Sequence, residues 1–357
     1  MNFRRPISHG TGIRLLALCL LSFFLFQTTG IQVIHADETC LILAHAGAST
    51  LAPENTRAAF EKAKEAGADG IETDVRMTKD HKLVLRHDEA IDRTSSGHGL
   101  ISLLTLDELK SYDFGSWFDA SFAGEKILTL DEGLAEIRKL GFHTINLELK
   151  PDARNSEELI RLTAESIERS GIADRVIVSS FDKNLLKSFH TRAPSVKTAI
   201  LTIPDMQAIS VLHLENYLPK DKPLNEYTKE DVSSLPDILA FILRAFGSHG
   251  ESNEDIFLDV IHGISEVAPE GADWSDVQLL IDEQADPVSF VDGLEFHPDY
   301  INCHHSSLTE TLISAMNERG IGVMVWTPDS FLELQKTKLF QPDGVITNEP
   351  ELARSVN

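Results

Sequence analysis

The chain has 357 residues, of which 42% are hydrophobic and 25% are charged, and this composition is typical of a folded globular protein. Its 56 acidic residues outnumber its 32 basic residues, which gives a formal net charge of −24. Nucleic-acid binding requires a basic surface, and anionic membranes repel acidic proteins, so the charge argues against both kinds of partner. Three cysteines are too few for a disulfide framework.

Residues 1–36 have the pattern of a secretory signal peptide. Three arginines and no acidic residue precede an apolar stretch over 15–26, which is too short to cross a bilayer comfortably. Ala36 permits cleavage before Asp37, although Ile34 departs from the small residue usual at its position. We expect an exported protein, secreted or periplasmic, with no stable transmembrane segment after cleavage. An uncleaved signal anchor is the alternative.

Two cysteines, Cys40 and Cys303, remain after such a cleavage. Cysteines can pair in an oxidising compartment, so a Cys40–Cys303 disulfide is one expectation and two free thiols are the other. The sequence does not test the geometry that a disulfide needs.

From residue 41 onward, short apolar strands alternate with amphipathic helices, which indicates βα units and a parallel sheet. Eight or nine such units in one domain predict an α/β fold, a (β/α)8 TIM barrel over 37–357. Strands two and three are separated by a short turn, so they are either a hairpin-like extension or successive barrel strands. The predicted strands are 41–44, 71–75, 83–86, 144–149, 175–179, 198–201, 300–302, 322–326 and 344–347.

Helix starts are marked by side chains that cap free backbone N–H groups. Asn55 or Thr56 opens a helix that Gly67 closes, and a helix over 157–170 ends at Gly171. Three further starts have the Ser/Thr-x-x-Glu form of a capping box. They are Thr105 with Glu108, Thr129 with Glu132, and Ser307 with Glu310.

Residues 203–290 interrupt the strand–helix alternation. They hold 18 acidic and 4 basic residues and contain helical patterns, including the almost wholly apolar 235–246. Structureless loops of this length are rare in compact domains, so we predict an inserted acidic helical subdomain. The apolar helix is either the core of this insert or a lid that meets an apolar substrate tail.

Six titratable residues lie at or near the carboxyl ends of predicted strands: two histidines, three carboxylates and one lysine. Two pairs of them are two residues apart on one strand, so each pair faces one side of the sheet. Because the strand ends of a parallel barrel share one mouth, we expect all six around one cavity. They are His45, His87, Glu72, Asp74, Glu148 and Lys150.

This set of residue types suits phosphodiester cleavage. Three carboxylates without a cysteine partner favour a hard divalent cation bound through oxygen, Ca²⁺ or Mg²⁺. Two histidines can divide the roles of general acid and general base near neutral pH. A cation and an ammonium group together neutralise a phosphodiester and the charge that develops on it. Each residue alone is also compatible with a surface ion pair or a structural role.

The sequence resembles the glycerophosphodiester phosphodiesterase family over 41–202 and about 292–355, with the most specific motifs in the first part. The resembling runs are His45-Ala46-Gly47-Ala48-Ser49, Ala52-Pro53-Glu54-Asn55-Thr56, Ala58-Ala59-Phe60, Gly67-Ala68-Asp69, Ile71-Glu72-Thr73-Asp74-Val75, Thr78-Lys79-Asp80, His87-Asp88, Asp92-Arg93-Thr94, Phe122-Ala123-Gly124-Glu125, Leu128-Thr129-Leu130, Glu148-x-Lys150, Ser180-Phe181-Asp182, Val325-Trp326-Thr327 and Gly344-Val345-Ile346-Thr347. The insert at 203–290 has no counterpart in the family pattern.

The resemblance implies a (β/α)8 barrel and a metal-dependent phosphodiesterase. It assigns one divalent cation to Glu72, Asp74 and Glu148, and general acid–base roles to His45 and His87 without deciding which histidine does which. Related barrels cleave by attack of the substrate's own neighbouring hydroxyl, which gives a cyclic phosphate. The resemblance also makes the lysine at position 150 a cation on the phosphate side.

Some positions depart from the family pattern. Ala46 stands where the family usually has a phosphate-binding Arg directly after the first His, so Arg76 or Arg93 can fill that role, the substrate can differ, or the enzyme can be slow. A charge-assisted hydrogen bond of this kind is worth about 1.5–3 kcal/mol. Smaller departures are Leu128 for Pro, Pro328-Asp329 after Trp326-Thr327, and Asn348 for Asp.

Aromatic side chains also occur at two later strand ends. Trp326, at a strand end, either forms an apolar wall that binds substrate or packs in the core. The pair His304-His305 has no carboxylate or cysteine at ligand spacing, and we interpret it as a solvated strand end.

The sequence therefore predicts an exported phosphoric diester hydrolase that cleaves a small glycerophosphodiester to an alcohol and glycerol phosphate. A first alternative is a phospholipase D-like enzyme that acts on lysophospholipids, with the apolar insert helix holding the acyl chain. A second is a non-catalytic binding protein on a decayed barrel. Only Ala46 motivates the second, and the presence of both histidines and all three carboxylates disfavours it.

Overall fold

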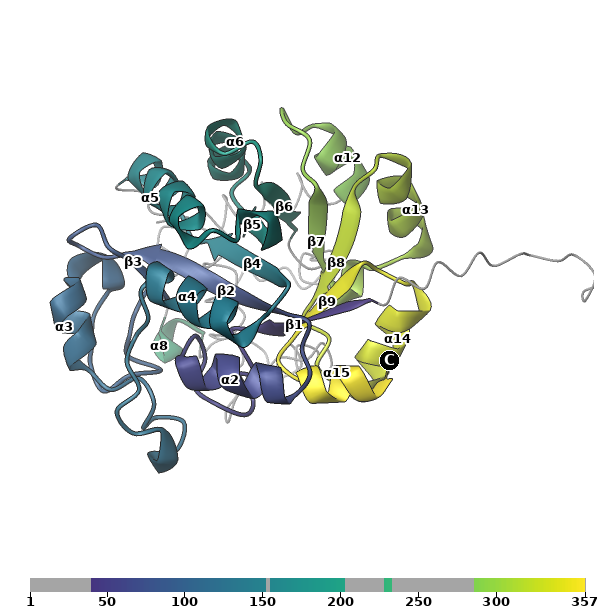
Figure 1. The fold of residues 1–357 in the computed structure, drawn as a ribbon. Coiled ribbons are helices and arrows are strands. Elements are labelled where there is room, and N and C mark those ends of the chain that lie inside the picture. The colour runs from purple at the N-terminus through teal and green to yellow at the C-terminus, as the bar shows by residue number, and fades with distance from the viewer. Residues whose placement is uncertain (1–39, 152–154, 203–227, 233–285, 357) are drawn as a thin grey trace, which may run out of the picture. The chain divides into compact units, whose positions relative to one another are not determined.

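The computed structural model describes residues 40–151, 155–202, 228–232 and 286–356. Eight parallel strands close into a barrel in the order β1-β2-β4-β5-β6-β7-β8-β9, with β9 pairing back to β1 (Figure 1). This confirms the predicted TIM barrel. The strands are β1 (Leu41–His45), β2 (Gly70–Met77), β4 (Thr144–Leu149), β5 (Val176–Ser180), β6 (Lys197–Leu201), β7 (Tyr300–His304), β8 (Gly322–Trp326) and β9 (Gly344–Thr347).

The ninth strand, β3 (Leu83–Leu85), lies outside the barrel. It pairs antiparallel with the end of β2, with Val75 opposite Leu85, so the hairpin-like alternative is the correct one. The segment that follows β3 has an apolar cluster of its own, formed by Val84, Ile91, Ile101, Leu109, Phe114 and Ile127. The hairpin thus carries this segment over the carboxyl end of β2, where the predicted site lies.

Helices lie outside the strands, as Figure 1 shows. They are α2 (Arg57–Glu65), α3 (Leu106–Ser111), α4 (Leu130–Leu140), α5 (Ser156–Ser170), α6 (Lys183–Arg192), α8 (Lys229–Val232), α12 (Pro287–Asp292), α13 (Glu310–Glu318), α14 (Phe331–Leu339) and α15 (Pro350–Val356). The capping boxes predicted at α3 and α4 are present, and α2 and α5 begin and end within a residue or two of their predicted bounds.

One predicted cap is wrong. The cap of helix α13 is Thr309, two residues after the predicted Ser307, and its side chain accepts the hydrogen bond from the Leu312 N–H. Residues 305–307 instead form a short 3-10 turn. A further capping box, Ser330 with Glu333, starts α14 and was not predicted. Both caps satisfy N–H groups of the first helical turn, which have no partner within the helix.

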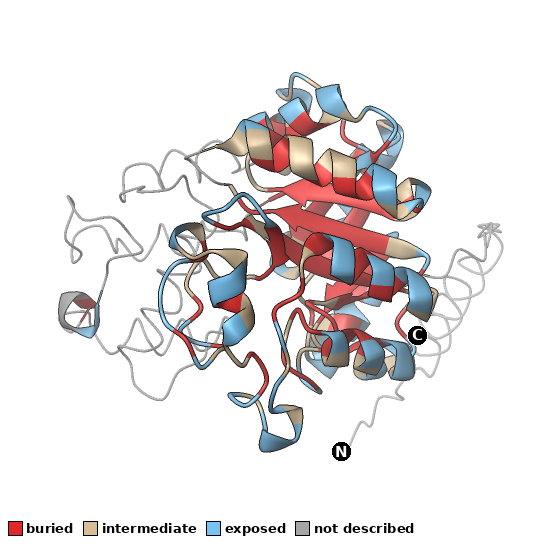
Figure 2. Ribbon diagram, turned by 60° about the vertical axis from the view of Figure 1, so that its left-hand side comes forward, coloured by how far each residue is buried: buried red, intermediate tan, exposed pale blue. Residues whose placement is uncertain are grey.

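The core has two layers, and the strands separate them. The larger layer fills the space between strands and helices, where buried side chains such as Phe60, Phe142 and Phe189 pack. A smaller layer inside the barrel consists of Leu43, Ile177, Ala199, Met324 and Ile346. Figure 2 shows the strands almost wholly buried and the outer faces of the helices exposed. The apolar interior layer leaves the carboxyl-end positions for polar side chains.

The two cysteines are free, so the predicted disulfide alternative is wrong for this structure. Cys303 on β7 is fully buried in the layer between strands and helices. Cys40 packs against the separate cluster around Leu334 and Val345. Burial raises the pKa of both thiols to about 12, which suits inert buried cysteines.

The predicted signal peptide over 1–36 lies outside the described residues, as does nearly all of the predicted insertion at 203–290. Among the described residues, the structure contains no helix with the length and apolar character needed to cross a bilayer.

Gly70 provides a test of how closely the barrel strands approach each other. A Cβ atom at this position would overlap the carbonyl oxygen of Thr144 on β4. We expect Gly70→Ala to destabilise the protein by about 1–3 kcal/mol, measured by denaturant unfolding. The control is Gly293→Ala, where φ is −81° and the nearest atom to a new Cβ lies 3.4 Å away. Equal stability of the two variants would contradict the prediction.

Candidate active site

Glu72, Asp74 and Glu148 meet at the carboxyl end of the barrel. Each offers a carboxylate oxygen, and these oxygens lie within 4.8 Å of one another. The register explains the meeting, because Asp74 on β2 pairs with Glu148 on β4 and Glu72 lies on the same face two residues earlier. All three residues are buried, with 8% or less of their surface exposed. The structure therefore brings the three predicted ligands together.

Lys150 is the cationic partner of this carboxylate triad. Its Nζ lies 2.8 Å from Glu148 Oε1 and 3.3 Å from Asp74 Oδ1, and the side chain is almost wholly buried. One ammonium group leaves three carboxylates with an excess negative charge, which a divalent cation would neutralise. Burying such an excess without compensation is costly.

The donor set fits a divalent cation. All three ligands are oxygen donors, and the buried Asp74 Oδ1 has the Lys150 ammonium 3.3 Å away but accepts no well-aligned hydrogen bond among the described residues. Burial and the negative charges of Asp74 and Glu148 raise the pKa of Glu72 well above its usual value. Burial also acts to raise the pKa of Asp74, but Lys150 and the two histidines outweigh it and hold that pKa below its usual range.

Asn55 supports the triad, and this role was not predicted from the sequence. Its Nδ2 donates to Asp74 Oδ2 at 3.0 Å, and its Oδ1 accepts a hydrogen bond from the Thr73 hydroxyl. Its backbone has φ of +57°, a left-handed conformation that asparagine tolerates better than most residues. The Pro53-Glu54-Asn55-Thr56 run belongs to the family pattern, but no local pattern indicates that Asn55 contacts Asp74, 19 residues further along the chain.

His45, the last residue of β1, lies beside the triad. Its Nε2 is 3.7 Å from Glu72 Oε2, and its ring lies 6.2 Å from the His87 ring, edge to face. On its other side, His45 Nδ1 lies 2.7 Å from Asn348 Oδ1. The predicted pair of histidines is therefore together at one edge of the triad.

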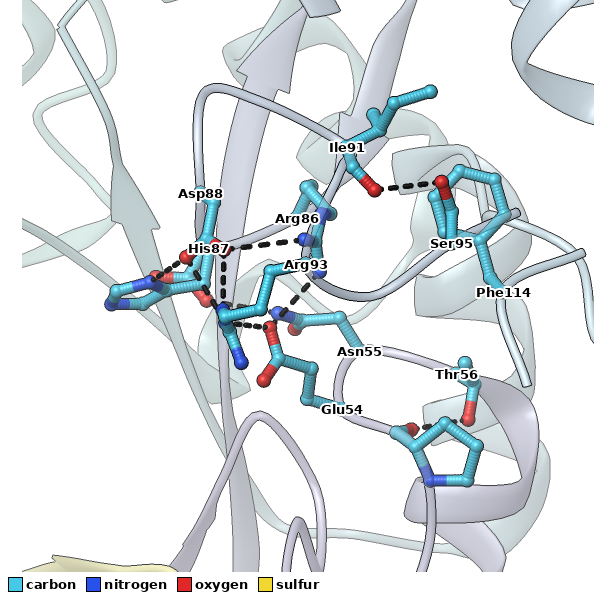
Figure 3. A network of polar contacts seen from close by, with 12 residues as sticks. Glu54, Asn55, Thr56, Arg86, His87, Asp88, Ile91, Arg93, Ser95 and Phe114 are labelled. Atoms are coloured by element: carbon cyan, nitrogen blue, oxygen red, sulfur yellow. Dashed lines mark hydrogen bonds and ion pairs between the residues drawn. The ribbon is translucent and has the colours of Figure 1, made fainter. Parts of the chain in front are cut away.

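His87 reaches the site from the segment after β3 and not from a barrel strand. Its Nδ1 lies 2.9 Å from Asp88 Oδ1 (Figure 3). Burial alone would raise the pKa of Asp88, but the His87 hydrogen bond and the Arg93 guanidinium outweigh it and hold that pKa well below its usual value. The carboxylate beside His87 is thus ionised over the whole neutral range.

Two arginines hold this carboxylate in place, as Figure 3 shows. Arg93 donates to Asp88 at 2.7 Å and to Glu54 Oε1 at 2.8 Å, and the fully buried Arg86 contacts the same two carboxylates. Arg93 is therefore engaged with protein carboxylates and is poorly suited to replace the arginine that the family places after the first histidine.

Ala46 itself is buried and has φ of +52°. Its N–H points to Glu72 Oε2 at 3.4 Å, so the residue contributes to the triad through its backbone. The other sequence candidate, Arg76, lies on β2, two residues after Asp74. Its Nε donates to the His87 carbonyl oxygen, and the two atoms are 2.8 Å apart.

Trp326 belongs to an aromatic wall formed by Phe181, Trp326, His304 and His305. Ring centroids lie 5.7 Å apart for Phe181 and Trp326, 4.9 Å for Trp326 and His304, and 4.2 Å for the two histidines. The Trp326 indole N–H donates to the Asn302 carbonyl, which fixes its orientation. His304 and His305 lie at the end of β7, as predicted, but they are half-buried and not fully solvated. Burial lowers the pKa of His304 to about 3.

The fold and these side chains define the class of the protein: a TIM barrel whose strand ends hold a buried carboxylate site fit for a divalent cation. Residues 45–228 match the model of the glycerophosphoryl diester phosphodiesterase family. The chain belongs to this family, as its motifs indicated. The family activity is phosphoric diester hydrolysis, and the predicted enzyme class agrees with it.

Individual relatives agree with the family match. The chain is 42% identical over 161 residues to a glycerophosphodiester phosphodiesterase of Caldanaerobacter subterraneus subsp. tengcongensis. The aligned residues cover 45% of this chain and 66%, slightly under two thirds, of the relative. It is 38% identical over 199 residues to a glycerophosphodiester phosphodiesterase of Bacillus altitudinis, covering 54% of this chain and 80% of the relative.

A solved structure shows the same fold. It is an Oleispira antarctica phosphodiesterase in complex with the product sn-glycerol-3-phosphate, 22% identical, with a TM-score of 0.60 over 88% of this chain and 96% of that one. At this identity the likeness concerns the fold.

Replacing Glu72 with Gln should make the metal-free protein more stable than the wild type and the metal-loaded protein less stable. Removal of one buried charge should raise the Tm of the metal-free protein by about 2–4 °C. Because the pKa of Glu72 is raised, wild-type metal-free stability should fall as the pH rises from about 4.3 through that raised pKa, and the variant should lack this fall.

In the same experiment, an excess of Mg²⁺ or Ca²⁺ at about 100 times its Kd should stabilise the wild type by about 2.7 kcal/mol and leave Glu72→Gln nearly unaffected. The matched control is Glu136→Gln, because Glu136 is also a buried glutamate but pairs with Lys139 on α4. Calorimetric titration checks the metal binding. Wild-type Mg²⁺ and Ca²⁺ affinity in the Glu72 variant would contradict the assignment of Glu72 as a ligand.

Proposed function

We propose that the protein hydrolyses glycerophosphodiesters to an alcohol and glycerol phosphate. The observation that carries the proposal is the buried triad of Glu72, Asp74 and Glu148 with both His45 and His87 beside it. Family membership supports the same reaction. The relatives named above are glycerophosphodiester phosphodiesterases, and the Oleispira antarctica structure contains the product sn-glycerol-3-phosphate.

Ca²⁺ or Mg²⁺ on the triad would supply Lewis-acid stabilisation of the charge that develops on the phosphate. One histidine removes the proton of the substrate hydroxyl next to the phosphate, and that oxygen forms a new bond to phosphorus. The other histidine gives its proton to the departing alcohol oxygen as the phosphorus–oxygen bond breaks. This first step leaves a cyclic phosphate, and Lys150 is the cation on the phosphate side. In the second step, water opens the cyclic phosphate and the two histidines exchange their roles.

A phospholipase D-like activity on lysophospholipids is the second candidate. The aromatic wall that contains Phe181 and Trp326 favours it, because these two rings pack edge to face at the strand ends and provide apolar surface for substrate. The apolar helix predicted over 235–246 lies outside the described residues. In both candidates Trp326 is a substrate-binding residue.

We also propose that residues 1–36 direct export and are removed before Asp37. The basic start, the short apolar stretch and Ala36 support this. Mass spectrometry of the protein recovered from its producing cells tests the cleavage. A mature N-terminus at Asp37 in the exported fraction is the expected result, and an intact chain held in the membrane would favour the signal-anchor alternative.

Turnover of glycerophosphocholine should require a divalent cation and both histidines. We expect activity with Ca²⁺ or Mg²⁺, loss of activity with chelator, and a fall in kcat of about 10²–10⁴-fold in His45→Gln and in His87→Gln. His98→Gln is the matched control, because His98 hydrogen-bonds Asp92 but is exposed.

The same assay with lysophosphatidylcholine separates the candidate functions. Turnover of the lysolipid alone would replace the first candidate with the second. Absence of turnover with either substrate, in protein whose unfolding transition is intact, would favour a binding protein.

Ala46→Arg tests the departure beside His45. An arginine that contacts the phosphate before and during the reaction should lower KM by about ten-fold or more and change kcat less. Ala46→Gln is the control for side-chain length without charge. An unchanged KM in a folded Ala46→Arg protein would show that the phosphate is already fully held by other groups.

A further inference from the structure

A chain of hydrogen bonds leads away from the site on the far side of His45. His45 Nδ1 lies 2.7 Å from Asn348 Oδ1, and Asn348 Nδ2 donates to Asp329 Oδ2 at 2.6 Å. Asp329 Oδ1 accepts from the Asn348 N–H at 2.8 Å and from the Thr347 hydroxyl at 2.9 Å. Both residues follow barrel strands, Asp329 after β8 and Asn348 directly after β9.

These contacts determine how the Asn348 amide is oriented. A carboxylate only accepts hydrogen bonds, so the Asn348 atom that faces Asp329 must be the NH₂ group. The carbonyl oxygen then faces His45, where it also accepts from the Ser49 hydroxyl at 2.6 Å. A flipped amide would place two acceptors against each other at the Asp329 contact.

The orientation of the amide in turn determines the tautomer of His45. An amide oxygen accepts only from a protonated nitrogen, so neutral His45 carries its proton on Nδ1 and a lone pair on Nε2. The nearby Glu72 carboxylate, 3.7 Å from Nε2, favours the opposite tautomer. The two carboxylates therefore favour different positions for the single proton of neutral His45. Asp329, acting through Asn348, favours Nδ1, and Glu72 favours Nε2 on the opposite side of the ring.

We propose that Asp329 and Asn348 are positioning residues, which hold neutral His45 with its proton on Nδ1 and so keep Nε2 open to exchange a proton with substrate. Neither side chain touches the carboxylate triad, and both act through His45. The activity part of the test rests on the proposed phosphodiesterase function, whereas the tautomer itself does not.

The variant Asp329→Asn tests this with almost no change in shape. Without the carboxylate, the Asn348 amide can flip, its NH₂ group can donate to His45 Nδ1, and Nε2–H can point to Glu72. We expect the His45 nitrogen signals, in ¹⁵N NMR of full-length protein labelled in histidine at about pH 8.5, to change from the Nδ1–H pattern toward the Nε2–H pattern. His45→Gln identifies the signals by their loss.

A double variant, Asp329→Asn with Asn348→Asp, provides the rescue. It places a carboxylate directly against His45 Nδ1, and this carboxylate can only accept, so the Nδ1–H tautomer should return. In kinetics, Asp329→Asn should lower kcat about ten-fold with little change in KM, and the double variant should recover most of that loss.

Asp343→Asn is the matched structural control. Asp343 accepts the Val323 N–H at 2.6 Å at the opposite end of β8 and β9, so this variant should alter stability without moving the His45 signals. An Nε2–H pattern in the wild type, or unchanged His45 signals in Asp329→Asn, would overturn the proposal. The expected signals in a protein without turnover would uphold the positioning role and reject the proposed function.

Discussion

Three carboxylates buried side by side are the constraint on which the site depends. Glu72, Asp74 and Glu148 would repel one another strongly in a medium that screens charge poorly, and Lys150 compensates for only part of that repulsion. Backbone register forces them together, because pairing of β2 with β4 brings their side chains to one face. The folded barrel therefore holds more buried negative charge than Lys150 neutralises. A divalent cation would neutralise the remainder, and for this reason the site fits such a cation.

Each histidine is held on its Nδ1 side by a group of different character. Asn348 does this for His45, and the ionised Asp88 does it for His87. An adjacent carboxylate stabilises an imidazolium more than an amide does. The two histidines therefore have unequal surroundings although they are neighbours, and the proposed division into one proton donor and one proton acceptor needs such a difference.

Local patterns in the sequence predicted most of the barrel and the triad, because strand periodicity and i, i+2 spacing act within a few residues. Such local patterns did not predict the aromatic wall or the contact between His45 and Asn348. His45 and Asn348 are 303 positions apart. In the sequence, Asp329 and Asn348 differ from the family pattern at separate positions, and nothing there indicates that they contact each other. Contacts of this kind arise only when β9 returns to β1 and closes the barrel.

Two of the basic groups near the site are already engaged with protein carboxylates. Lys150 lies against Glu148 and Asp74, and Arg93 lies against Glu54 and Asp88. With Ala46 beside His45, a cation bound to the triad would supply attraction for the phosphodiester anion of the proposed substrate that these two groups do not. Such a site couples substrate binding to metal binding, because a triad without a cation repels the same anion that a loaded triad attracts.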